Sequence, residues 1–307
     1  MCDVRIRVAV ALIGLLATLT ACGNTSTKAI EITSSMVTSV TFSATQSPRY
    51  TKVIALANGS AEIIDSMGLK EILIGRDIAS TDESLKSIPI VSTGHQIVAE
   101  KIIALQPQLV IIDESVGPKD AISAITSAGI KVELINEVWS VKEISTKVIA
   151  IAKLLGTAQA GQSLADEINL KITQSAQAVD GSPRIAFLYL RGGNSIYLLG
   201  GKGSGADSMI QALGGIDVGA AVSDRPFSAF SSESFANEEP EILLVMSKGL
   251  ESVGGVDGLV ALPGIAQTKA GKNRAVIAVD DSLLLSFGPR TPNLLMELAA
   301  AINRVKR

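Results

Sequence analysis

A single histidine is the side chain in this sequence best suited to bind a metal. His95 lies in the segment STGHQIVAE, directly after Gly94 and before an expected helix that carries Glu100. Neutral imidazole is a good ligand for iron, and a loop between a strand and a helix would place it at the rim of a cleft. The alternative is a solvated loop histidine, which the residues alone favour.

Other side chains offer weaker chemistry. Tyr189, Tyr197 and Met246 carry donor atoms, but packing in the core explains each of them better. The segment GGKGSG (200–205) opens an expected helix, yet it lacks the Gly-Lys-Ser/Thr ending of a phosphate-binding loop. The sequence contains no nucleophile elbow, no HExxH motif and no paired histidines. It therefore favours a binding protein over an exported enzyme such as a hydrolase.

Two glutamates occupy equivalent places in an internal repeat. AEKIIALQPQLVII (99–112) matches SESFANEEPEILLV (232–245), and Glu100 and Glu233 each lie seven positions before a proline. Each proline ends a helix, because it forces the preceding residue out of the helical conformation. The repeat predicts two lobes of similar build. It also places both carboxylates in exposed first turns of helices, where a negative charge is favourable.

The elements that position these residues follow an α/β pattern. From residue 50 onward, short apolar strands alternate with amphipathic helices. Residues 157–180 contain no proline and place Leu164, Ile168 and Ile172 at helical spacing, which predicts one long, stiff helix between the lobes. The expected domains are a signal peptide (1–21), a flexible tether (22–49), an N-terminal lobe (50–156), a linker helix (157–180) and a C-terminal lobe (181–307).

The N-terminus indicates export. A positive region precedes an apolar run from Val8 to Leu19, which is the layout of a secretory signal. This run is shorter than the ~20 residues of a membrane-spanning helix. It ends in LTACG, which resembles a bacterial lipobox with Cys22 as the acylated residue. The resemblance implies a lipid anchor at the outer face of the cell membrane or in the periplasm, and an incidental Cys22 after an ordinary signal is the alternative.

Composition excludes several classes of protein. The chain is 47% hydrophobic and 19% charged, which excludes a disordered chain. Its 27 basic residues do not exceed its 30 acidic ones, so it lacks the basic surplus typical of nucleic-acid binding. One histidine and two cysteines are too few for a conventional zinc site.

Three stretches carry a resemblance to a known family: MSKGLESVGGVDGLVALPGIAQTKAG (246–271), VIAVDDSLLLSFGPRTP (276–292) and GGKGSGADSMIQALGG (200–215). They resemble heme-binding proteins of ABC importers, and the similarity extends over most of residues 50–305. The resemblance implies a class III periplasmic-binding-protein fold, with two Rossmann-like lobes joined by one long rigid helix. It also implies a monomer that takes heme into its cleft and delivers it to a permease and its ATPase. A cobalamin or ferric-siderophore carrier of the same fold is the alternative.

The resemblance also implies roles for single residues. The family carries a tyrosine or histidine ligand of the heme iron directly after the glycine that matches Gly94, which assigns this role to His95. Many relatives place a second tyrosine shortly before the glutamate that matches Glu233. Here Phe227 stands at that place, and since phenylalanine cannot bind iron, the second ligand stays open.

The remaining candidates are contacts rather than iron ligands. Arg225 is a candidate partner of a heme propionate, and Phe227 and Tyr197 are candidate cleft contacts. Arg290 either shapes the turn before the last helix or contacts heme. In resembling importers one glutamate of each lobe docks onto arginines of the permease, which assigns that role to Glu100 and Glu233. No metal apart from the heme iron is expected.

Overall fold

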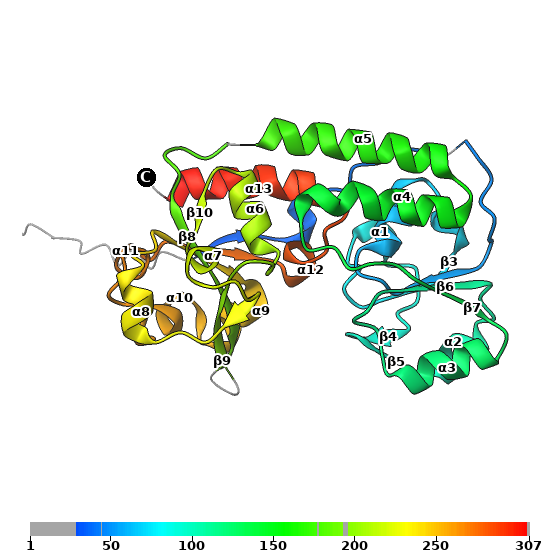
Figure 1. The fold of residues 1–307 in the computed structure, drawn as a ribbon, viewed down its shortest axis with the longest axis horizontal. Coiled ribbons are helices and arrows are strands. Elements are labelled where there is room, and N and C mark those ends of the chain that lie inside the picture. Colours follow the sequence, from blue (N-terminus) through cyan, green and yellow to red (C-terminus); the bar gives the residue numbers. More distant parts are fainter. Residues whose placement is uncertain (1–28, 44, 177, 193–195, 306–307) are drawn as a thin grey trace, which may run out of the picture.

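Two α/β lobes lie side by side along the long axis of the molecule (Figure 1). The structure, a computed structural model, describes residues 29–305 except 44, 177 and 193–195. The predicted signal peptide and Cys22 lie outside the described residues. No described helix is long and apolar enough to cross a membrane.

The N-terminal lobe is built on a four-stranded parallel sheet. Its strands follow the order β3 (Leu73–Arg76), β2 (Val53–Ala55), β6 (Leu109–Ile112) and β7 (Lys131–Leu134). The central strands β2 and β6 are buried throughout, as expected for parallel strands covered on both faces. A short hairpin of β4 (Ser92–Thr93) and β5 (Gln96–Ile97) extends from this lobe.

The C-terminal lobe contains a seven-stranded mixed sheet. Its main order is β1 (Ile30–Ile32), β13 (Val276–Val279), β12 (Ile242–Met246), β8 (Arg184–Arg191), β9 (Ile196–Gly200) and β11 (Phe227–Ser228), and β10 (Ile216–Asp217) also pairs with β8. The strands from β1 to β8 are parallel, whereas β9 and β11 add an antiparallel edge. Two parallel-stranded α/β lobes confirm the predicted fold class.

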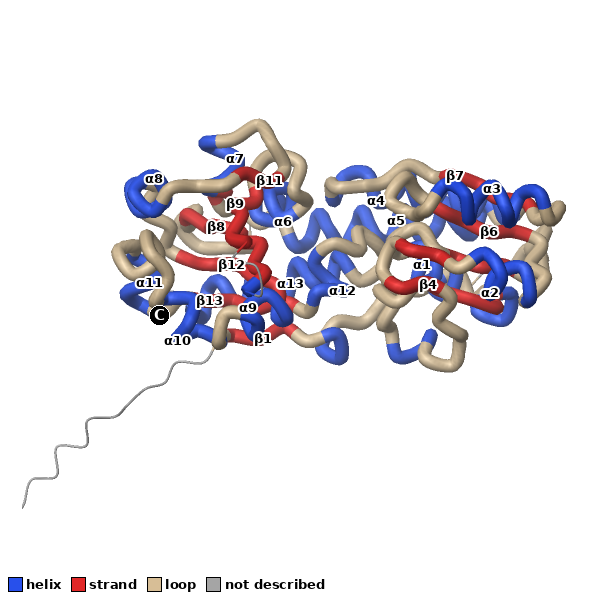
Figure 2. The backbone as a smooth tube through the Cα atoms, turned by 90° about the horizontal axis from the view of Figure 1, so that it is seen from below, coloured by secondary structure: helices blue, strands red, loops and turns tan. Residues whose placement is uncertain are grey.

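Helices cover both sheets (Figures 1 and 2). In the N-terminal half they are α1 (Ser60–Ser66), α2 (Ala99–Ala104), α3 (Lys119–Ser127), α4 (Ile144–Leu155) and α5 (Ala158–Ser175). In the C-terminal half they are α6 (Ala206–Ala212), α7 (Val218–Val222), α8 (Ser232–Asn237), α9 (Ser247–Ser252), α10 (Gly255–Val260), α11 (Lys269–Asn273), α12 (Asp281–Leu284) and α13 (Thr291–Val305).

Helix α5 is the predicted link between the lobes. It packs against α4 of the N-terminal lobe and α13 of the C-terminal lobe. Its contact with α4 is close, since a Cβ atom at Gly161 would lie 2.1 Å from the Cβ atom of Ala152. The helix is shorter than the expected 157–180, because the backbone becomes extended at Ala176.

The segment predicted to be a flexible tether, 22–49, is ordered where it is described. Strand β1 pairs in parallel with β13 at the edge of the C-terminal sheet. The chain then crosses to the other lobe, where Arg49 N donates to Leu155 O at 2.7 Å. Val37 and Val40 are buried along this path. The prediction of a tether was therefore wrong from Ile30 onward, and the lobes are joined by two chain crossings instead of one.

A polar seam holds the two lobes together. Arg290, in the loop before α13, forms an ion pair with Glu62 of α1, and each side chain is only 1% exposed. Burial raises the pKa of Glu62 to about 7, although the Arg290 cation opposes this shift. Arg290 therefore has a structural role, which settles the alternatives left open by the sequence.

A buried lysine adds a second connection across the seam. Lys147 Nζ of α4 donates to the carbonyl oxygens of Asn58 and Ser286, both at 3.0 Å. The Asn58 amide in turn donates to Leu285 O at 2.7 Å. Burial lowers the pKa of Lys147 to about 8. The loop between α12 and α13 is thus fastened to the opposite lobe by hydrogen bonds from Asn58 and Lys147.

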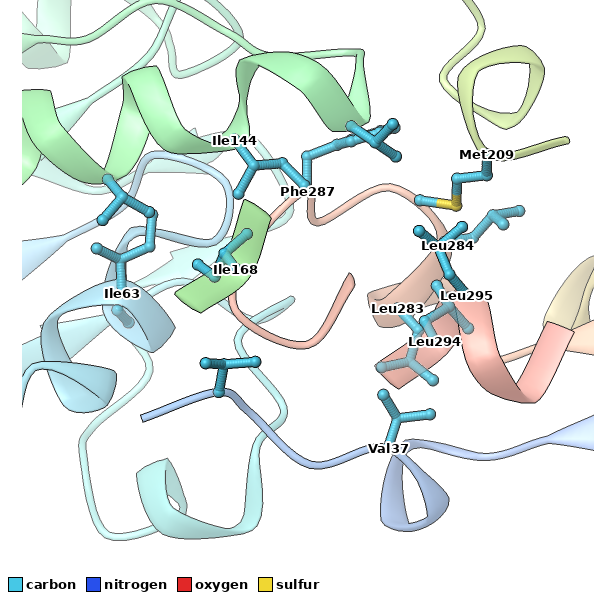
Figure 3. Close-up of a cluster of buried hydrophobic side chains, with 14 of the residues drawn as sticks. Val37, Ile63, Ile144, Ile168, Met209, Leu283, Leu284, Phe287, Leu294 and Leu295 are labelled. Atoms are coloured by element: carbon cyan, nitrogen blue, oxygen red, sulfur yellow. The ribbon is translucent and has the colours of Figure 1, made fainter. Parts of the chain in front are cut away.

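Apolar side chains of both lobes surround this polar seam. Figure 3 shows Ile144 of the N-terminal lobe beside Phe287 of the C-terminal lobe, with Ile63 on one side of this pair and Leu284 on the other. All four belong to one continuous hydrophobic core, which also includes Ile168 of α5. The lobes therefore share a core instead of being independent bodies on a flexible linker.

Replacing Arg290 with methionine tests the seam. We expect Arg290→Met to lower the free energy of unfolding by about 3–5 kcal/mol at pH 8, because Glu62 is left as a buried charge without its partner. The loss should be smaller at pH 5, where Glu62 can take up a proton. Chemical denaturation at the two pH values measures both effects. The double variant Glu62→Gln/Arg290→Met is the control and should recover most of the stability; equal losses in both variants would contradict the account.

Candidate ligand-binding cleft

A cavity of about 150 Å³ lies between the two lobes. Its N-terminal wall includes Leu56, Asp77 and Ser115, which follow the carboxyl ends of β2, β3 and β6. Its C-terminal wall includes Asp281 and Ser286, which follow β13. Ligands of open α/β sheets bind at the carboxyl ends of the strands. The volume is below the ~300–1,000 Å³ of common ligand pockets, so a larger ligand would extend from it along the facing walls.

His95 lies at the edge of this cavity. It occupies the turn of the β4–β5 hairpin, after Gly94, whose φ of 63° is readily adopted by glycine. The backbone of His95 is fixed, since its carbonyl oxygen accepts from Gly117 N at 2.9 Å. Its exposed imidazole has no hydrogen-bond partner among the described residues. The ring is therefore held at the cleft with its nitrogen atoms free to bind a ligand.

Tyr189 and Arg191 lie near the carboxyl end of β8 in the other lobe. Arg191 Nε donates to the phenol oxygen of Tyr189 at 2.7 Å, and the guanidinium lies 5.3 Å from the centre of the tyrosine ring. The ring of Phe227 meets Tyr189 edge-on at 5.5 Å between centroids. A hydrogen bond from a cation stabilises negative charge on the phenol oxygen. This arrangement suits a phenolate that binds a metal ion.

The other candidate residues that the sequence indicated lie in different places in the structure. Phe227 lies beside Tyr189, whereas Tyr197 is paired with Leu190 across β8 and β9. Because alternate residues of a strand face opposite sides, Tyr197 lies on the other face of the sheet from Tyr189. It lines a separate apolar cavity of about 330 Å³. Arg225 is exposed in the loop before β11, and its side chain has no partner among the described residues.

Sequence reasoning treated Tyr189 as a core residue and passed over Arg191. Tyr189 and Arg191 are two positions apart on β8, so they share one face of the sheet. This spacing at the carboxyl end of a strand was the signal that could have identified them.

A second cavity, of about 400 Å³, adjoins the cleft on the C-terminal lobe. Its charged lining residues are Arg191, Lys248 and Asp281, and Met246 at the end of β12 also lines it. Asp281 lines the cleft cavity as well, so the two cavities meet at this residue. In Figures 1 and 2, α12 lies between α9 and the hairpin region of β4. No group of three or more His, Cys, Asp or Glu side chains among the described residues could hold a metal ion.

The repeated glutamates lie on equivalent helices of the two lobes. Glu100 is in the first turn of α2 and Glu233 in the first turn of α8, and both are exposed. The repeat extends to the backbone, since Gln106 and Glu239 before the two prolines have positive φ values of 49° and 45°. Neither repeated glutamate has an ion-pair partner among the described residues.

The fold and the cleft define an extracytoplasmic substrate-binding protein. The chain belongs to the periplasmic binding protein family, whose sequence profile matches residues 53–283. Proteins of this family bind substrates and are not enzymes, which confirms the predicted absence of catalytic activity.

Several solved structures similar to this chain are of heme-binding proteins. The periplasmic heme-binding protein RhuT from Roseiflexus sp. RS-1 is 35% identical, with a TM-score of 0.78 over 84% of this chain and 100% of RhuT. The heme-binding protein HmuT is 29% identical, with a TM-score of 0.75 over 89% of this chain and 94% of HmuT. Structures of HmuT variants with alanine in place of a histidine, a tyrosine, or an arginine two positions after that tyrosine also match.

Curated relatives are more distant. The vitamin B12-binding protein of Vibrio parahaemolyticus serotype O3:K6 is 22% identical over 83% of this chain and 90% of its own length. The ABC transporter substrate-binding lipoprotein YvrC of Bacillus subtilis (strain 168) is 24% identical over 82% of this chain and 79% of its own length. These matches confirm the predicted family and leave the substrate to be argued from the site.

Proposed function

We propose that this protein captures heme between its lobes and delivers it to the permease of an ABC importer. Two observations carry the proposal: a histidine with free nitrogen atoms at the cleft, and a tyrosine that accepts a hydrogen bond from a cation near the carboxyl end of β8 in the other lobe. His95 has a free imidazole on the N-terminal side, and Tyr189 is hydrogen-bonded to Arg191 on the C-terminal side. Histidine and tyrosine are both common ligands of heme iron.

Tyr189 is the second iron ligand in this proposal. A phenolate needs a neighbouring positive charge when it leaves water, and the Arg191 Nε atom supplies it at 2.7 Å. Phe227 then packs against the ligand instead of replacing it, at 5.5 Å between ring centroids. The three residue types substituted in the HmuT variants, with tyrosine and arginine two positions apart, are the types found here at His95, Tyr189 and Arg191. This correspondence supports the assignment.

Cobalamin transport is the second candidate function. It draws support from the vitamin B12-binding relatives, which are 22–24% identical to this chain. The heme-binding RhuT is 35% identical and is covered completely. A histidine donor on one lobe and a tyrosine donor on the other also suit an iron atom that takes two protein ligands. We therefore favour heme.

Hemin titration of three variants tests the two ligands. We expect His95→Ala and Tyr189→Phe each to shift the Soret band and to weaken hemin binding roughly tenfold or more, which corresponds to about 1.4 kcal/mol or more. Tyr197→Phe is the matched control, because Tyr197 lies on the opposite face of the sheet, and its spectrum and affinity should equal those of the wild type. Unchanged spectra in both His95→Ala and Tyr189→Phe would rule out the proposed ligands.

Delivery to the permease is assigned to the repeated glutamates. Glu100 and Glu233 lie on α2 and α8, in different lobes, and each is exposed and unpaired among the described residues. In Figure 1 both helices lie away from the linker α5. Two carboxylates placed in this way suit a partner that carries one cationic patch for each lobe.

The double variant Glu100→Ala/Glu233→Ala tests this docking role. We expect hemin affinity to stay at the wild-type value while heme uptake in cells falls further than in either single variant, since each exposed ion pair contributes about 0.2–1 kcal/mol. Glu71→Ala/Glu251→Ala removes two other exposed carboxylates and should leave uptake unchanged. Full uptake in the first double variant would contradict the assignment.

An extracytoplasmic location follows from the family, and a lipid anchor is the finer proposal. Cys22 follows the LTA sequence at the end of the apolar run. We expect Cys22→Ser to remain exported while it loses its lipid mass and leaves the membrane fraction. Cell fractionation with mass spectrometry measures both properties. A variant that stays on the membrane with a bound lipid would show that Cys22 is incidental.

A further inference from the structure

Two cations line the cavity next to the proposed iron site. Arg191 and Lys248 both contribute to this space of about 400 Å³, which shares Asp281 with the cleft cavity. Neither cation has an ion-pair partner among the described residues. The cavity therefore offers two positive charges that the fold itself does not neutralise.

The single carboxylate of the cavity does not cancel these charges. Asp281 Oδ2 accepts a hydrogen bond from the backbone nitrogen of Lys248 at 3.1 Å, so it is engaged by the main chain. One carboxylate against two cations leaves the lining with a net charge of +1. A guanidinium has five N–H donors, and Tyr189 takes only the Nε donor of Arg191. The others can reach a second acceptor.

We infer that Arg191 and Lys248 form a carboxylate subsite that selects a tetrapyrrole with free acid groups. This inference rests on the proposed function. Heme carries two propionate groups, whereas a corrinoid carries amide groups around its ring. Cationic side chains bind a carboxylate through charge-assisted hydrogen bonds, which a neutral amide cannot match. Lys248, near the start of α9, lines the same cavity as Arg191, so these two cations would hold a propionate if the iron were bound at Tyr189.

The subsite would distinguish the two candidate substrates, heme and cobalamin. The two proposed iron ligands, His95 and Tyr189, would bind the metal but would not distinguish the substituents of the tetrapyrrole ring. The same guanidinium would support Tyr189 through Nε and a propionate through its remaining donors. Metal binding and recognition of the acid group would therefore be coupled through one side chain, Arg191.

Lys248→Gln tests the subsite without touching the iron ligands. The probes are hemin and hemin dimethyl ester, in which methyl esters replace the two charged propionates, and affinity is measured by the Soret titration. We expect the wild type to prefer hemin, and Lys248→Gln to reduce that preference up to about fivefold, as for an exposed ion pair. Ester affinity and the Soret position should not change.

The control is Lys272→Gln, which removes an exposed lysine of α11 outside the cavity. It should keep the wild-type preference for hemin over the ester. An unchanged preference in Lys248→Gln would overturn the subsite while leaving the proposed function intact. A wild-type chain that shows no ligand-bound Soret band with either compound would instead overturn the proposed function, and the subsite with it.

Discussion

The buried ion pair between Glu62 and Arg290 is the interaction on which the geometry of the cleft depends. Both side chains are 1% exposed, so each would be a costly isolated charge without the other. Arg290 ends the segment that runs from α12 to the start of α13, and this segment forms the C-terminal wall of the cleft cavity through Asp281 of α12 and Ser286 of the loop. The pair therefore fixes the position of one cleft wall relative to the opposite lobe.

The other contacts between the lobes also fix their relative position. Lys147 and Asn58 bind the carbonyl oxygens of the same loop, one hydrophobic core extends through both lobes, and the chain crosses between them twice. Because the cleft is already ordered in the folded protein, ligand binding carries a smaller entropy cost for ordering it. His95 and Tyr189 thus belong to two lobes whose relative placement is already set by these contacts.

Much of this architecture could be predicted from the sequence. Parallel strands buried on both faces appear as continuous apolar runs, and the repeat around Glu100 and Glu233 reappears in the structure down to its positive φ values. The ordered path of residues 30–43 and 45–49 could not be predicted in the same way. Its few apolar residues stand in a segment rich in serine and threonine, and its strand partner, β13, lies more than two hundred residues further along the chain.

The candidate site likewise contains one residue that the sequence revealed and others that it did not. His95 was recognisable because it is the only histidine in the chain. Tyr189 was not recognisable, because an aromatic residue inside an apolar strand is typical of a protein core. Only the sheet register shows that Tyr189 shares a face with Arg191 and Phe227. Tyr197 lies on the opposite face. The seam was equally hidden, since Glu62 and Arg290 are 228 positions apart.

A crystal structure of the chain with bound hemin would show whether heme is captured between the lobes. We expect a heme iron bonded to a His95 nitrogen from the N-terminal lobe and to the Tyr189 oxygen from the C-terminal lobe, with the Glu62–Arg290 pair intact. Iron bonded to neither side chain, or heme bound outside the cleft, would contradict this expectation.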